Sequence, residues 1–177
     1  MNKRKGQVSV EYIMIIVISL MILIPGTYVF RNFVFESNDD ILNQRLTEVS
    51  NQILSRSRKI HYFGPPSRSV VEIEMPPSID NMYIMSVPDN TQKNEYYLAY
   101  TLLTTKGPIQ KLFLSDIPIR TGENITCLAN LYCQANCDCF PMRYYSKGIK
   151  NIRARSVYDP LVDQFYIEIK EISNDQI

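Results

Sequence analysis

The first thirty residues place the strongest constraint on what this chain can fold into. Three basic residues, Lys3, Arg4 and Lys5, precede a segment from Tyr12 to Phe30 that contains no formally charged side chain. As a helix this segment spans about 28 Å, which is close to the hydrocarbon thickness of a bilayer. Because the basic residues gather on its amino-terminal side, we expect a membrane-spanning helix with a cytoplasmic amino terminus.

The boundary between the basic leader and the apolar segment differs from that of a secretory signal peptide. Such a peptide has an apolar core of 7–15 residues that is followed by a small-residue cleavage site. Here the small residue, Gly6, comes before the apolar segment, and Glu11 lies at the inner edge of that segment. A carboxylate costs roughly 2.5–3.5 kcal/mol at the centre of a membrane helix and less near the interface. This cost predicts a partner for Glu11.

Basic residues, Gly6 and then the pattern Gln7-x-Ser9-x-Glu11-Tyr12 stand directly before the apolar helix. This arrangement resembles the class III signal sequence of archaeal type IV pilins. The resemblance implies that a prepilin peptidase cleaves between Gly6 and Gln7, so that the apolar helix stays on the mature protein. It also implies that Glu11 acts in assembly with other pilin subunits on a pilus assembly platform.

The predicted cleavage has a simple physical consequence for Glu11. It frees an α-amino group, with a pKa of about 7.7–8.0, at the start of an apolar helix. Pairing this ammonium with Glu11 of a neighbouring subunit satisfies both charges, and breaking a buried ion pair typically costs about 3–5 kcal/mol. The alternative is a carboxylate that the helix dipole and headgroup water favour at a helix start.

The helix is predicted to continue as an amphipathic segment as far as residue 62. Pro25-Gly26 predicts a kink or a short unwound stretch, or else a proline that the membrane helix tolerates. Beyond Asn32 apolar residues recur at steps of three and four, and Ser37–Asp40 marks either a break or a polar turn of a continuous helix. Gly64-Pro65-Pro66 then predicts the helix end.

After Gly64 the apolar period changes from that of a helix to the two-residue alternation of half-buried strands. The predicted strands are Ser69–Met75, Met82–Val87, Glu95–Thr104, Ile109–Ser115, Lys150–Tyr158 and Gln164–Ile172. We therefore predict an α+β fold in which a long kinked helix (7–62) follows a leader (1–6) and packs on an antiparallel β-sandwich-like domain (67–177). The tyrosines of this domain either pack in its core or form a contact face.

Four cysteines, Cys127, Cys133, Cys137 and Cys139, lie in one predicted loop, 123–143. On the outside of a membrane they predict two disulfides, for which the sequence allows three pairings. Zinc binding and free thiols are alternatives, although the spacing differs from that of separated Cys-x2–4-Cys pairs. We therefore predict disulfides and no metal site.

Asn124 and His61 are the other two residues with a possible chemical role. Asn124-Ile125-Thr126 is an N-x-[ST] sequon beside the cysteines, so Asn124 is a candidate for N-glycosylation. His61, the sole histidine, lacks a nucleophile motif to act with, and no catalytic, cofactor-binding or nucleic-acid-binding motif is evident. We expect no enzymatic activity, no cofactor and no nucleic-acid partner.

These features together predict a structural subunit of an extracellular archaeal type IV pilus-like filament that serves surface attachment. The precursor is expected in the cell membrane, and the mature chain on the cell surface. One alternative is an uncleaved, single-pass membrane-anchored binding protein. Another is a subunit of an archaellin-like motility filament.

Overall fold

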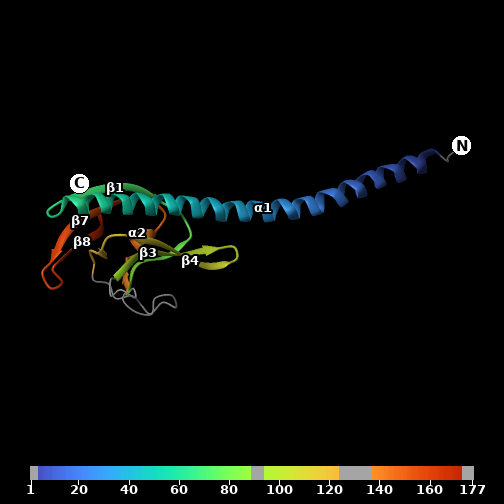
Figure 1. Cartoon of the computed structure of the whole chain (residues 1–177). Coiled ribbons are helices and arrows are strands. Elements are labelled where there is room, and N and C mark those ends of the chain that lie inside the picture. Colours follow the sequence, from blue (N-terminus) through green and yellow to red (C-terminus); the bar gives the residue numbers. More distant parts are fainter. Residues whose placement is uncertain (1–3, 89–93, 124–136, 173–177) are drawn as a thin grey trace. The chain divides into compact units, whose positions relative to one another are not determined.

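The computed structural model describes residues 4–88, 94–123 and 137–172, and for residues 4–9 it describes the backbone alone. The chain divides into two compact units, Met1–Ile41 and Leu42–Ile177, which are described separately. The first consists of helix, and the second combines helix with two β-sheets (Figure 1).

One helix, α1 (Arg4–Phe63), supplies residues to both units. It remains helical at Pro25 and through Ser37–Asp40, so no unwound stretch and no break occurs at either predicted point. The Thr27 hydroxyl donates to the Leu23 carbonyl at 2.6 Å, two residues beyond Pro25. This bond lies two residues further along than the bond that Pro25 cannot make, which would reach the Met21 carbonyl.

The end of α1 lies where the sequence predicts it. Gly64 has φ +68°, the left-handed conformation that glycine adopts most easily, and its N–H lies 3.2 Å from the carbonyl oxygens of both Ile60 and His61. A glycine in this conformation satisfies the last carbonyls of a helix and turns the chain away from the helix axis. The first strand follows directly.

Besides the outer part of α1, the described residues of the second unit form eight strands and one short helix. Their bounds are β1 (Arg68–Met75), β2 (Ile79–Pro88), β3 (Asn94–Thr104), β4 (Gly107–Ser115), β5 (Ile119–Thr121), β6 (Cys137–Cys139), α2 (Met142–Tyr145), β7 (Gly148–Asp159) and β8 (Gln164–Ile172). All six predicted strands are confirmed. The short elements β5, β6 and α2 had not been predicted.

The strands form two four-stranded sheets with the orders β1-β7-β8-β5 and β4-β3-β2-β6. All pairs are antiparallel except β5–β8, which is parallel with Ile119 opposite Ile167. The first sheet is therefore mixed at its β5 edge, and the predicted α+β fold, a long helix packed on a largely antiparallel β domain, is confirmed. The short strand β5 can join β8 in this direction because a long connection through β6, α2 and β7 separates them.

A single buried cluster joins α1 to both sheets. Its helical members recur at steps of three and four residues and form the buried stripe of the outer helix: Leu46, Val49, Ile53, Leu54 and Ile60. Strands of both sheets supply the remainder, including Ile73, Met82, Leu98, Ile152 and Ile167. Burying large aliphatic side chains contributes about 1.5–3 kcal/mol each, so the helix stripe is part of the core of the second unit.

The most buried tyrosines belong to the interior, as the core interpretation of their abundance predicts. Tyr83, Tyr100 and Tyr144 are at most 1% exposed, and the Tyr100 ring meets Phe113 edge-on at 5.9 Å. Tyr158, in contrast, is 45% exposed and lies 5.3 Å from the Phe165 ring. Tyrosine therefore serves mainly, but not exclusively, as a core residue here.

Candidate functional site

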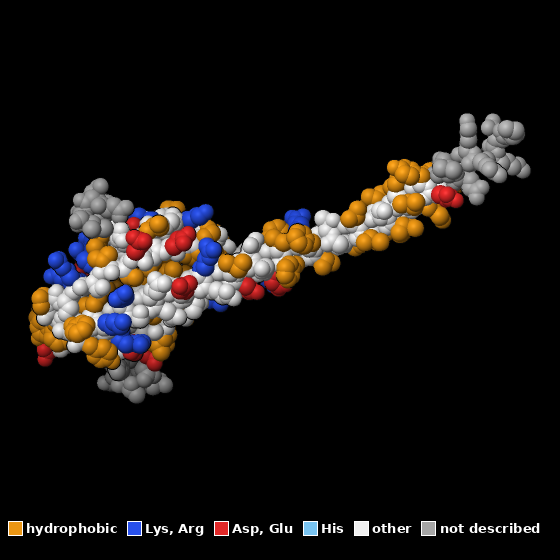
Figure 2. Space-filling model, turned by 90° about the horizontal axis from the view of Figure 1, so that it is seen from above, with side chains coloured by type: hydrophobic (Ala, Val, Ile, Leu, Met, Phe, Trp, Pro, Cys, Tyr) orange, Lys and Arg blue, Asp and Glu red, His pale blue; other side chains and the backbone are white. Residues whose placement is uncertain are grey.

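The inner part of α1, from Val10 to Phe35, has an apolar surface on all sides. Figure 2 shows orange side chains along this segment, and every described apolar side chain from Val10 to Phe35 is at least 37% exposed. The hydroxyls of Ser19 and Thr27 donate to carbonyls one turn earlier, at 2.8 and 2.6 Å, so they need no outside partner. The segment is long and apolar enough to cross a membrane.

The residues of the predicted signal sequence lie at the start of this helix. Gly6 and Gln7 have a helical backbone, and their side chains are outside the described part of the structure. Glu11 is exposed and forms no ion pair with any described side chain. Its role and the predicted cleavage therefore stay predictions.

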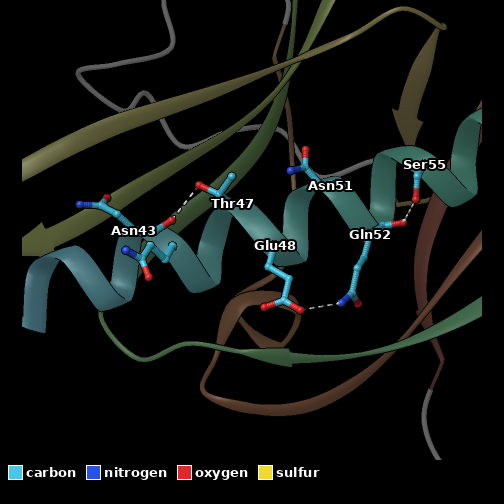
Figure 3. Close-up of a pocket in the computed structure, with 7 residues that line it drawn as sticks. Asn43, Thr47, Glu48, Asn51, Gln52 and Ser55 are labelled. Carbon is cyan, nitrogen blue, oxygen red and sulfur yellow. Dashed lines mark hydrogen bonds between the residues drawn. The ribbon is translucent and has the colours of Figure 1, made fainter.

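A polar groove follows the outer part of α1, with a volume of about 740 Å³. Figure 3 shows that its side chains come from successive turns of the helix. Thr47 donates to the Asn43 carbonyl at 2.8 Å, and Gln52 donates to Glu48 at 3.4 Å. These bonds connect residues one turn apart, and the groove holds neither histidine nor cysteine. It is an open face of the helix lined by polar side chains.

The two ends of the predicted cysteine loop meet in a cluster of charged side chains. Arg143 of α2 donates to the Glu123 carboxylate, and the Tyr144 hydroxyl contacts the same carboxylate oxygen at 3.2 Å. Glu171 of β8 lies 3.8 Å from Arg143 and 3.7 Å from Lys150. We call Glu123, Arg143, Tyr144, Lys150 and Glu171 the loop anchor, because they tie residue 123 and α2 to the first sheet.

No pattern in the sequence indicates the loop anchor. Its members lie as far apart as Glu123 and Glu171, and Lys150 and Glu171 occupy positions that alternation would assign to the buried side of their strands. Only the strand register brings them together. An amphipathic pattern can locate the buried face of a strand, but it cannot show which charged residues from different strands contact one another at the end of that face.

Burial raises the pKa of three tyrosines among the described residues of the second unit, Tyr100, Tyr144 and Tyr145. Burial raises the pKa of Tyr144 to about 12 and also raises that of Tyr100. An unfolded chain loses these protons near pH 10, whereas the folded chain retains them to higher pH. Because the folded state then binds more protons, its free energy of unfolding falls as the pH rises from about 10 towards 12.

We therefore expect alkaline destabilisation that depends on Tyr144. In full-length chain held in a nonionic detergent, the denaturant midpoint should fall between pH 10 and 12. A Tyr144→Phe chain should show a shallower fall, because it lacks one of the tyrosines whose pKa is raised, while Tyr62→Phe, at a 77% exposed position, should match the parent. Equal pH slopes for all three chains would contradict this assignment.

The remaining predicted residues are described only in part. Cys137 and Cys139 lie on β6, and both are disulfide-bonded. Cys127, Cys133 and the sequon residue Asn124 lie outside the described residues, so the pairing and the glycan stay predictions. His61 lies in the last turn of α1, with its ring edge-on to Tyr62 at 6.3 Å.

The comparisons with known proteins give no family for the chain. No family model, no curated protein and no solved structure matches it. The class therefore follows from architecture alone: a long apolar amino-terminal helix followed by β-sheets is a pilin-like arrangement.

Proposed function

We propose that this chain is a structural subunit of an extracellular type IV pilus-like filament that serves surface attachment. The observation that carries the proposal is the exposed apolar surface of α1 from Val10 to Phe35. Contiguous apolar surface of this extent marks an interaction site or a membrane contact. In a filament, the same segments of neighbouring subunits cover one another in the interior.

The length of the apolar surface favours a filament over a simple membrane anchor. It continues beyond Arg31 to Phe33, which is 67% exposed, and to Val34 and Phe35. Residues 10–35 extend about 39 Å as a helix, whereas the hydrocarbon core of a bilayer is about 30 Å thick. A membrane covers only part of this surface, and neighbouring helices cover the remainder.

The partners follow from this proposal. The precursor enters the membrane through α1, a prepilin peptidase cleaves between Gly6 and Gln7, and an assembly platform adds the mature chain to other pilin subunits. Glu11 pairs with the new α-amino group of a neighbour. The second unit lies on the outside of the fibre and has no enzymatic role.

The amino terminus of the protein recovered from the cell surface tests the proposal. Mass spectrometry is expected to show a chain that begins at Gln7 and retains α1, in material that sediments as filaments. A chain that still carries residues 1–6 and stays in the membrane would support the anchored binding protein instead. Loss of swimming, with attachment intact, after deletion of the protein would support a motility filament.

A further inference from the structure

The outer face of the β1-β7-β8-β5 sheet carries cations in directly opposed positions. The register places Arg68 of β1 opposite Arg155 of β7, and Arg153 of β7 opposite Lys170 of β8. Ala154, between the two β7 arginines, is 2% exposed, so the alternation of side chains directs its neighbours away from the core. We call Arg68, Arg153, Arg155 and Lys170 the basic face.

The described part of the chain does not neutralise these cations. No ion pair joins any residue of the basic face to another described residue. Glu72 of β1 lies on the same face, opposite Asn151 and one pair along from Arg153. The carboxylate directly beside the cations in register is Glu168, opposite both Arg155 and Arg120. Its side chain leans over Gly122, where an added Cβ would lie 2.8 Å from the Glu168 Oε1 atom. The Glu168 carboxylate thus leans towards β5, and the four cations of the basic face outnumber the two carboxylates beside them.

Such an arrangement costs stability. Like charges placed directly opposite one another on a sheet repel, by an amount comparable to the roughly 0.2–1 kcal/mol that a favourable cross-strand pair contributes. Elsewhere in this unit cations meet carboxylates, as in Arg58–Asp116 at 2.8 Å and Arg120–Asp159 at 3.0 Å. Two adjacent like-charge pairs on one exposed face therefore indicate a ligand that supplies the missing negative charge.

We propose that the basic face binds an acidic polysaccharide through its carboxylate groups. Guanidinium groups match carboxylates in a bidentate geometry, which suits the three arginines of the face. Neighbouring strands lie about 4.8 Å apart, and alternate residues in a strand about 6.6 Å apart, so the four cations form a flat array. An extended polymer can lie across this array and contact several cations at once.

Other anionic partners fit this face less well. Single-stranded nucleic acid binds by stacking its bases on aromatic rings, and the Tyr166 ring on this face is already covered by the Arg120 guanidinium, 4.8 Å from its centroid. Duplex DNA accepts a helix or ribbon in its groove rather than a flat sheet. A lipid surface requires several inserted apolar side chains, whereas the exposed apolar side chain among these four cations is a single valine, Val70, opposite Arg153.

The inference rests on the proposed function in one respect, since the second unit must lie outside the cell to meet a polysaccharide. Its test is independent of filament formation. Full-length chain in nonionic detergent is titrated with fluorescent polyglucuronate at low salt, with neutral dextran as the comparison polymer. Saturable binding of polyglucuronate that weakens with added salt, and none of dextran, is expected.

A matched pair of double variants locates the binding. Arg153→Gln with Lys170→Gln should weaken polyglucuronate binding at least about tenfold, because it removes two charge-assisted contacts. Arg56→Gln with Lys59→Gln removes the same charge from exposed positions of α1 and should leave binding unchanged. Should the first variant fold poorly, Arg68→Gln with Arg155→Gln serves the same purpose.

Three outcomes would overturn the inference. The parent chain could fail to bind polyglucuronate, or both double variants could lose binding equally. Alternatively, a single-stranded oligonucleotide or anionic phospholipid vesicles could bind more tightly than polyglucuronate. A chain that binds the polymer but never forms filaments would refute the proposed function and leave this inference standing.

Discussion

A Glu11→Val chain is expected to be inserted and cleaved normally but to yield about a hundredfold fewer filaments, or none. The change leaves the α-amino group of Gln7, cationic at neutral pH, without its partner in an apolar interior. Breaking a buried ion pair costs about 3–5 kcal/mol, and each 1.4 kcal/mol is a tenfold change in an association constant. Filament yield is measured in material sheared from cells, and the amino-terminal mass shows whether cleavage occurred.

Two further variants, one at Glu11 and one nearby, separate the effect of charge from the effect of side-chain shape. Glu11→Gln keeps the size of the side chain and loses its charge, so it should also impair assembly. Ile18→Val trims a 55% exposed apolar side chain nearby without changing any charge, and should assemble close to normally. Undiminished filament yield from the Glu11→Val and Glu11→Gln chains would remove the ammonium–carboxylate pair from the proposal. The contact between apolar helices would still stand.

Gly6→Arg is expected to abolish processing. The predicted cleavage follows a residue without a side chain, and an arginine adds both bulk and charge directly beside the scissile peptide. The expected product is a membrane-bound precursor that retains residues 1–6, which intact-mass measurement distinguishes from the mature chain. Asn2→Arg adds the same charge within the leader, away from the predicted cut, and should be cleaved as usual. Normal cleavage of the Gly6→Arg chain would show that the cut lies elsewhere.

The larger elements were predictable because each repeats a pattern over many residues. The apolar segment, the stripe that includes Leu46 and Ile53, and the alternating strands each provide several consistent positions, so single exceptions do not mislead. Gly64 gave the helix end, since few other residues adopt a left-handed conformation easily. Ser37–Asp40 was ambiguous in sequence, because a polar turn occurs both in exposed helices and at helix starts.

The remaining features depend on contacts that one sequence does not display. Strand β5 is only three residues long, too short for a period to emerge, and its parallel pairing with β8 joins residues far apart in the chain. The loop anchor and the basic face likewise arise from register. A shift of one residue in the β7–β8 pairing would separate Arg153 from Lys170, and that pairing depends on the conformation of the turn between Asp159 and Gln164, which the sequence alone does not display.

The buried stripe of α1 limits where the chain could be cut to release a folded second unit. A protease that cut between α1 and β1 would remove Leu46, Val49 and Ile53 from the core. The apolar side chains of both sheets that pack against them would then be exposed. Losing even one such side chain typically costs about 2–5 kcal/mol. A soluble, shed form would therefore have to be severed no later than about Leu42, and would carry its piece of helix with it.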